Sequence, residues 1–297
     1  MSQSSSSKQS VVIGVLSGAL VVAISAAVFL YMSSSSERAG SGAEPAASEV
    51  SAAGSASVVT IAPPSASESM KELFGLQQGA EEVKTKPNEL TKVAFSTDFN
   101  LGSDRFYSQF FQSQDLLEGG QVSDSHASSV ALSVITYKQT GATWSVIDKK
   151  IALAESGTWG GLSNAPVEKL QLSPGSLGLL VDEGSSGQGY SNNGKSIFVF
   201  AGSQWRTAGY VDTGASNSGV CDPDFKPGSS DDSMKPCYEY SGKISVAPNA
   251  MGDFPDLLVT RQGTQEGEQP NQVGPAKNVT FKYIKDKYRD PAKPDGE

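Results

Sequence analysis

The sequence predicts a mainly β protein: antiparallel hairpins in a sandwich or propeller-like domain, preceded by one transmembrane helix and a disordered linker. An uncharged apolar run lies near the N-terminus, and a stretch of Ser, Ala, Gly and Pro follows it. Beyond these, short β-branched and aromatic runs alternate with Gly, Ser, Asn and Pro. The expected divisions are a cytoplasmic N-terminus, an anchor, the linker, a short helix, a β-rich extracytoplasmic domain and a disordered tail: 1–10, 11–32, 33–69, 70–88, 89–289 and 290–297.

The anchor is the run from Val11 to Met32, which holds no charged residue. As a helix it would measure ~33 Å, enough for a hydrocarbon core of ~30 Å. Lys8 lies on its N-terminal side, so the positive-inside rule predicts a single-pass protein of the inner (cytoplasmic) membrane. The N-terminus would be inside and the C-terminal domain periplasmic or extracellular. A cleaved signal peptide ending near Ser25-Ala26-Ala27 is the alternative, although the apolar run continues to Tyr31.

Small residues repeat along the anchor. Gly14 and Gly18 form a GxxxG pair, which lets two membrane helices approach closely. A homodimer through these glycines is one expectation, and the ordinary abundance of Gly in membrane helices is the other.

The linker from Ser33 to Ser69 has too few apolar residues to offset the entropy of ordering it. As a flexible coil it would reach ~35 Å. The residues from Met70 to Lys86 could form a short helix, which Pro87 would end.

The β-rich domain is predicted from runs of strand-forming residues. The predicted strands are Ser129–Tyr137, Thr143–Ala154, Val167–Leu172, Leu177–Asp182, Ser196–Ala201, Gln204–Asp212, Tyr238–Ala247, Leu257–Arg261 and Val279–Ile284. Ser103–Leu117 is the exception, because Phe106, Phe110 and Leu117 would share one face of a helix. Two Gly-x-x-Trp sequences, ending at Trp144 and Trp205, predict tight turns, each followed by an aromatic residue that packs on its hairpin.

One segment resembles a known family. Gly252-Asp253-x-x-Asp256-Leu-Leu-Val, within about residues 249–288, resembles the blade motif of FG-GAP/VCBS-type repeats in extracellular β-propellers. The resemblance implies a propeller-like arrangement of strands. The Asp/Asn-rich calcium loop of that family is largely missing here, so the resemblance does not extend to calcium.

A P-loop pattern, GxxxxGK[ST], matches residues 189–196. A true P-loop is followed by a helix whose N-terminus binds phosphate. Here Ile197–Phe200 predicts a strand, and Asn193-Gly194 is a common hairpin-turn dipeptide. We therefore expect a hairpin turn at Asn193-Gly194, with Lys195 of little importance for stability, and no nucleotide or other cofactor.

The chain has one histidine, His126, and two cysteines. A Ser/His/Asp triad needs an imidazole base, and the histidine lies in no G-x-S-x-G context. Zinc is disfavoured because the usual ligand sets need more His and Cys residues. The net charge of −9, without a Lys/Arg block, disfavours nucleic acid as a partner. Paired carboxylates remain open, because their spatial pairing is invisible in a sequence.

Cys221 and Cys237 bracket a polar loop rich in Pro, Gly and Asp. In an oxidising compartment such a pair predicts one disulfide. The loop is a candidate binding loop through Asp222, Asp224, Asp231 and Asp232, whose spacing does not match an EF-hand.

Three classes of function follow. The first is a non-catalytic envelope domain, in a Gram-negative bacterium as a working hypothesis, that binds an unknown protein or glycan. The others are an extracytoplasmic hydrolase that uses paired carboxylates, and an inhibitor or immunity-type envelope protein that presents the stapled loop. An Asp or Glu pair in a deep pocket would favour the hydrolase, and a flat patch beside the loop would favour binding.

Overall fold

The computed structural model describes residues 61–125, 128–158, 161–162, 166–225, 235–265 and 276–293. The expected anchor at 11–32 and most of the expected linker lie outside these ranges. Within them, no helix has both the length and the apolar character needed to span a bilayer.

The described chain is mainly antiparallel β-structure, which confirms the predicted class. The first sheet is a meander of five strands in sequence order: β1 (Glu82–Lys86), β2 (Glu89–Leu101), β3 (Asp104–Asp115), β4 (Val130–Thr140) and β5 (Thr143–Ser156). The nine strands predicted from sequence all overlap observed strands of the two main sheets.

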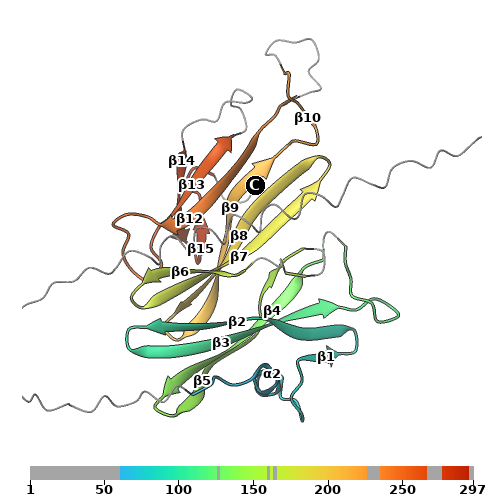
Figure 1. Cartoon of the computed structure of the whole chain (residues 1–297), viewed down its shortest axis with the longest axis vertical. Helices are drawn as coiled ribbons and strands as arrows, with labels where there is room; N and C mark the ends of the chain where they lie inside the picture. Colours follow the sequence, from blue (N-terminus) through green and yellow to red (C-terminus); the bar gives the residue numbers. More distant parts are fainter. Residues whose placement is uncertain are drawn as a thin grey trace, which may run out of the picture. The chain divides into compact units, whose positions relative to one another are not determined.

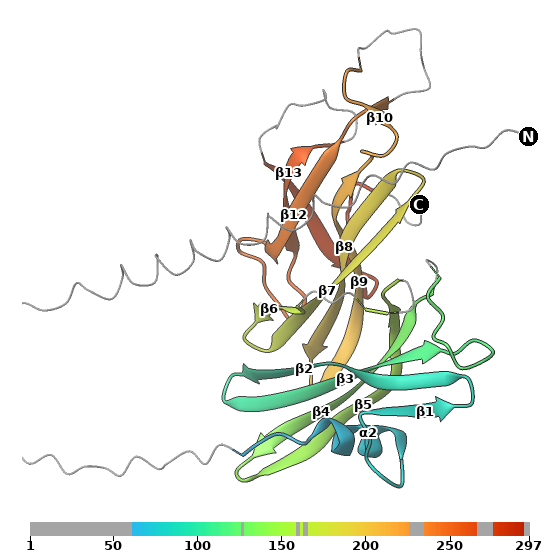
Figure 2. The same ribbon diagram turned by 45° about the vertical axis from the view of Figure 1, so that its right-hand side comes forward.

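The second sheet has eight strands in the order β15-β14-β13-β12-β9-β8-β7-β6. It curls into a half-barrel in which β15 returns to lie against β9 (Figure 1; Figure 2). Its strands are β6 (Glu168–Ser173), β7 (Ser176–Gly187), β8 (Tyr190–Ala201), β9 (Gln204–Ser216), β12 (Glu239–Val246), β13 (Leu257–Thr264), β14 (Lys277–Ile284) and β15 (Lys287–Arg289). The two-residue strands β10 (Cys221–Asp222) and β11 (Lys235–Pro236) pair with each other.

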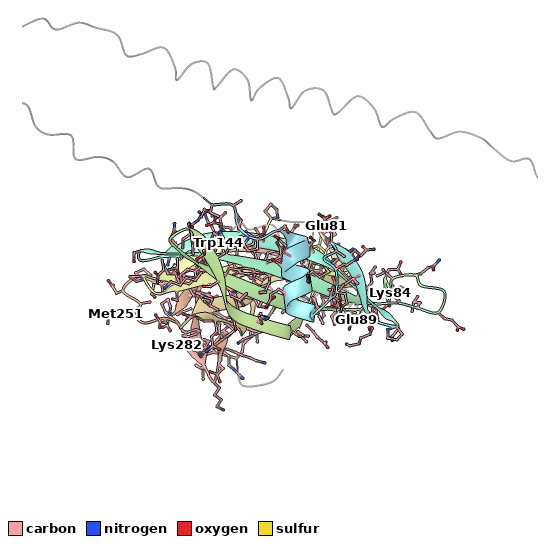
Figure 3. The ribbon with its side chains drawn as sticks, turned by 90° about the horizontal axis from the view of Figure 1, so that it is seen from below. Glu81, Lys84, Glu89, Trp144, Met251 and Lys282 are labelled. Atoms are coloured by element: carbon pink, nitrogen blue, oxygen red, sulfur yellow. A yellow bond between two sulfur atoms is a disulfide. The ribbon has the colours of Figure 1, made fainter. Side chains whose placement is uncertain are left out.

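One helix among the described residues, α2 (Ala66–Phe74), covers the outer face of the first sheet, as Figure 3 shows from below. Ser65 and Glu68 form a capping box at its start, and Gly75 ends it with φ 67°. Its buried Met70 and Leu73 pack against aromatic residues of β3 and β4. The capping box thus begins the helix inside the range expected to be linker. β1 occupies part of 70–88, where only a helix was expected.

The predicted helix at Ser103–Leu117 is wrong, because these residues form β3. β3 is buried on both faces: Phe106 and Phe110 face the second sheet, whereas Tyr107 and Phe111 face α2. A strand covered on both sides loses the apolar/polar alternation that identifies strands in a sequence. The spacing of its phenylalanines then imitates a helical stripe.

Trp205 of β9 joins the two sheets. Its side chain is fully buried among Phe99, Phe106, Phe110 and Phe200, with ring centroids 5.3–5.8 Å from those of Phe99, Phe110 and Phe200. Edge-on and tilted ring contacts of this kind stabilise a core beyond the area that they bury.

The polar atoms of Trp205 are also paired across the sheets. Its indole Nε1 donates to Ser108 Oγ of β3 at 2.9 Å. Its backbone N donates to Asp148 Oδ2 at 2.9 Å, and its carbonyl accepts from Lys150 Nζ at 2.6 Å. A buried tryptophan therefore joins the sheets without an unpaired donor.

The two Gly-x-x-Trp sequences form two-residue hairpin turns, as predicted. Gly141 and Gly202 have φ 57° and 58°, and the flanking residues pair directly on β4–β5 and β8–β9. Trp205 packs between the sheets. Trp144 packs beside α2, on the opposite face of the first sheet.

Replacing Ser108 tests the junction between the sheets. Ser108→Ala removes the acceptor of the buried indole N–H, so we expect the free energy of unfolding to fall by ~1–3 kcal/mol. Chemical denaturation measures this loss. Thr207→Ala, at an exposed position of β9, is the control and should change stability by less than ~0.5 kcal/mol. Equal effects of the two substitutions would contradict the role given to the indole bond.

Candidate functional site

The inner face of β7 and β8 changes from apolar to polar along the strands. Leu179 and Val181 of β7 belong to the core between the sheets, and Glu183 follows on the same face because side chains alternate. On β8 the same face runs from Phe198 to Ser196. Figure 1 shows both strands continuing past the five-stranded sheet, so the polar residues lie beyond the core.

A hollow of about 580 Å³ lies at this polar end. It is lined by Gly157, Thr158, Gly161, Leu162, Asp182, Glu183, Gly184, Ser185, Ser186, Ser191 and Asn193. A second hollow, of about 470 Å³, shares the lining residues Thr158, Glu183, Gly184 and Ser185 and adds Asn192, Tyr210 and Asp212. We refer to the two together as the polar hollow. Among the described residues its lining contains no Lys, Arg or His.

Glu183 is held in one orientation. Its Oε1 accepts hydrogen bonds from Ser156 Oγ, from Gly157 N at 3.2 Å and from Ser196 Oγ at 2.6 Å. All three donors are uncharged. Within the described ranges no cation lies within ion-pair distance of Glu183 and no donor reaches its Oε2, so this carboxylate is an acceptor with one oxygen available.

Gly157, Thr158, Gly161 and Leu162, which follow β5, line one side of the polar hollow. Thr158 Oγ1 donates to Gly184 O at 3.1 Å, and Thr158 and Gly161 exchange backbone hydrogen bonds. Gly157 has φ 79°, and a Cβ there would lie 2.2 Å from Gly161 O. Glycine at position 157 permits this close approach, and the Gly157 N–H donates to Glu183 Oε1.

Tyr210 lies on the opposite side of the polar hollow, with its ring against the backbone of Gly194. A Cβ at position 194 would lie 2.2 Å from Tyr210 Cζ, so only glycine fits beneath the ring. The residue nevertheless remains 43% exposed. Partial burial, followed by the negative charges of Asp212 and Glu183, raises the pKa of Tyr210 to about 12, so its hydroxyl stays protonated near neutral pH.

Asp212 is fixed by an ion pair. Its Oδ2 accepts from Arg261 Nη2 at 3.0 Å and from the Tyr240 hydroxyl at 3.2 Å. Burial and the Asp212 charge raise the pKa of Tyr240 to about 12. Of the acidic residues in the polar hollow, Asp212 is therefore neutralised by Arg261, whereas Glu183 is not.

The P-loop pattern is a hairpin, but its turn is not where the sequence predicted. Gln188 and Gly189, with φ 51° and 82°, form the turn between β7 and β8. Asn193 and Gly194 lie within β8, at a shift in its register with β9, and the glycine makes room for the Tyr210 ring. The strand predicted after Lys195 is confirmed.

The contacts of Lys195 are more extensive than expected for a residue of little importance for stability. Its side chain is 13% exposed, and its Nζ lies 2.5 Å from Asp182 Oδ1 and 2.8 Å from Glu168 Oε1. Burial opposes the ammonium charge, but the two carboxylates outweigh burial and raise the pKa of Lys195. Lys195 therefore links β6, β7 and β8.

The predicted disulfide between Cys221 and Cys237 is confirmed, with an S–S distance of 2.02 Å. In the candidate binding loop, Asp222 Oδ1 accepts from the backbone N of Asp224 at 2.9 Å, which is a local turn contact. Asp231, Asp232 and His126 lie outside the described residues. Over the described ranges, no group of three His, Cys, Asp or Glu side chains could hold a metal ion.

The segment that resembles a propeller blade begins in the connection between β12 and β13, and the Leu-Leu-Val of its motif starts β13. Asp253 Oδ1 accepts from Ser173 Oγ at 3.1 Å, and the Asp253 carbonyl accepts from Ser176 Oγ at 2.8 Å. These bonds attach the segment to the β6–β7 turn. The propeller resemblance itself stays a prediction.

Sequence reasoning missed Glu183, Tyr210 and Asp212 as site residues. The change from Leu179 and Val181 to Glu183 is the signal that was present, since it marks where one face of a strand leaves the core.

Comparison of this chain with protein-family models, with curated proteins and with solved structures finds no match.

Lys195→Met should lower the free energy of unfolding by ~1–2 kcal/mol, between the values for exposed and buried ion pairs. The raised pKa means that this contribution is present below the unfolded-state value of ~10.4 and is lost as the pH rises through the folded-state value. The difference between wild type and variant, measured by denaturation, should thus be constant from about pH 6 to 9. Lys86→Met, which removes an exposed pair with Glu89, is the control. Equal losses in the two variants would contradict the assignment.

Reduction of the disulfide should lower the melting temperature. Closing a loop of this length stabilises by ~3 kcal/mol, which corresponds to roughly 6–12 °C for a domain of this size. Thermal unfolding with and without reductant measures the shift. The Cys221→Ser/Cys237→Ser double variant is the control and should not respond to reductant. Two freely alkylated thiols in protein isolated from cells would contradict both the bond and an oxidising location.

Proposed function

We propose that this protein is a membrane-anchored, extracytoplasmic binding module, and that the polar hollow takes its ligand. The single observation that carries the proposal is the geometry of Glu183 and Tyr210. A carboxylate fixed by three donors and a partly exposed aromatic ring line the same concavity. Few, rigidly held polar groups in a concave site are typical of ligand binding.

The anchor at residues 11–32 and the linker after it would hold the polar hollow outside the cytoplasm. The Cys221–Cys237 bond supports this location, because structural disulfides persist in oxidising compartments. The partner would then be an envelope component within the linker's reach of the membrane.

The groups that line the polar hollow are suited to binding rather than to proton transfer. Glu183 and Asp212 already accept hydrogen bonds, and Asp212 is paired with Arg261. The pKa of Tyr210 is raised to about 12, far from the neutral range in which a general acid or base works best. We therefore propose that the polar hollow binds a ligand and does not act on it by proton transfer.

A hydrolase with paired carboxylates is the second candidate. In its favour, Glu183 and Asp212 line one hollow. In the strand register both lie opposite Gly194, Glu183 on β7 and Asp212 on β9. Their Cα atoms are therefore roughly 10 Å apart, which is two strand spacings. Inverting glycosidases place their carboxyl groups ~6.5–9.5 Å apart. In this chain Asp212 is already paired with Arg261, and Glu183 already accepts three hydrogen bonds through one oxygen, and these contacts favour a binding role for both carboxylates.

A photo-crosslinking residue tests the proposal. Placed at Ser185, which is exposed and lines the polar hollow, in the full-length protein in intact cells, it should form an adduct with an envelope component. The same residue at Ser145, exposed on β5, should not. Mass spectrometry of the crosslinked peptides distinguishes the two sites. Equal labelling at both positions, or none at Ser185, would overturn the assignment of the polar hollow as the binding site.

A further inference from the structure

We infer that the ligand of the polar hollow is a neutral saccharide, bound with one pyranose ring on Tyr210. This inference rests on the proposed function and names its ligand class. Three features support it: a flat aromatic surface, a set of hydrogen-bonding groups around it, and an uncompensated negative charge.

Tyr210 provides the flat surface. One side of its ring is fixed by the backbone of Gly194, where a side chain would lie 2.2 Å from Cζ, and 43% of the residue remains exposed. An aromatic ring held from behind loses little conformational entropy when a ligand covers its open side. The apolar C–H face of a pyranose ring matches such a surface, because Tyr combines an apolar body with a polar tip.

The groups around Tyr210 match sugar hydroxyls. Asn192 lies on β8, next to the strand of Tyr210, and Glu183 lies on β7, one strand further. Ser185 follows Glu183 on the same face of β7. A carboxylate oxygen accepts hydrogen bonds from hydroxyl groups, and an amide both donates and accepts. Apolar ligands are disfavoured because Leu162 is the one aliphatic side chain among the described lining residues.

The charge of the polar hollow selects against acidic sugars. Asp182 is paired with Lys195 and Asp212 with Arg261, which leaves Glu183 without a cationic partner in the described part of the chain. A carboxylate or phosphate on the ligand would meet this negative charge, and the described lining residues include no Lys or Arg to bind it. Like charges brought together in a partly desolvated site cost binding free energy.

A cationic ligand fits these contacts less well. An ammonium group would gain most from two free carboxylates, but Asp212 is already neutralised by Arg261 and by its hydrogen bond from Tyr240. One oxygen of Glu183, Oε1, also already accepts hydrogen bonds from Ser156, Gly157 and Ser196. Glu183 Oε2 remains beside the Tyr210 ring and the uncharged Asn192 and Ser185, and a ring that carries hydroxyl groups can use all of these.

The test measures binding of four probes to the full-length protein in detergent or nanodiscs by isothermal titration or NMR. The probes are the neutral trisaccharides of β-linked glucose and of N-acetylglucosamine, a trisaccharide of uronic acid, and spermidine. We expect at least one neutral trisaccharide to bind, and the uronic acid trisaccharide to bind at least ~10-fold more weakly, a difference of ~1.4 kcal/mol.

Variants locate the binding. Tyr210→Ala should weaken the neutral sugar at least ~10-fold, whereas Tyr210→Phe, which keeps the ring, should stay within ~3-fold of wild type. Tyr190→Ala, at an exposed tyrosine of the β7–β8 turn, is the matched control and should bind as wild type does. Glu183→Gln should reduce the discrimination against uronic acid. Melting temperatures of all variants identify any that fail to fold.

The outcomes separate this inference from the proposed function. Four outcomes would each overturn the inference of a neutral saccharide. They are binding of spermidine alone, equal binding of the uronic acid and neutral trisaccharides, and binding of none of the four probes. The fourth is neutral-sugar binding that survives Tyr210→Ala in a folded variant. The adduct at Ser185 decides independently whether the polar hollow binds a ligand at all.

Discussion

The contact of Trp205 with β3 is the constraint on which the rest of the described structure depends. Each sheet has an apolar face toward the other. Neither sheet could shield that face from water by itself. The indole fills the space between them, and its bond to Ser108 pairs the one polar atom of the indole. Because the junction lies near the Trp205 end of β9, the far end of the strand extends beyond the first sheet. The polar hollow exists because the sheets are joined at one end and not along their whole length.

Much of the fold could be predicted from local signals. Strands were recognisable because glycines such as Gly141 and Gly202 mark turns that need positive φ. The signal failed where tertiary packing replaced it. Ser103–Leu117 resembled a helix because β3 is buried between α2 and the second sheet. The Asn193-Gly194 dipeptide resembled a turn, but its glycine is required by a side chain from another strand.

The candidate site could not be predicted in the same way. Glu183 and Tyr210 are separated by 26 intervening residues in the sequence and come together only through the register of β7, β8 and β9. That register contains two shifts on the β8–β9 ladder, each of which changes the face on which later residues lie. The two-residue periodicity of a strand predicts faces only up to such a shift. The disulfide needed no such information, since the chain has two cysteines and one pairing.

Strands β7, β8 and β9 each contribute to two cores, since Val181, Phe198 and Trp205 face the first sheet whereas Leu180, Ile197 and Val211 face β12–β15. No cut in the chain can separate the two cores, because the same three strands would have to remain with both fragments. We therefore expect the described residues to unfold as one cooperative unit, although their two sheets follow each other in sequence like two domains. Dissection of this protein into smaller fragments would yield sheets with an exposed apolar face, which are prone to aggregate.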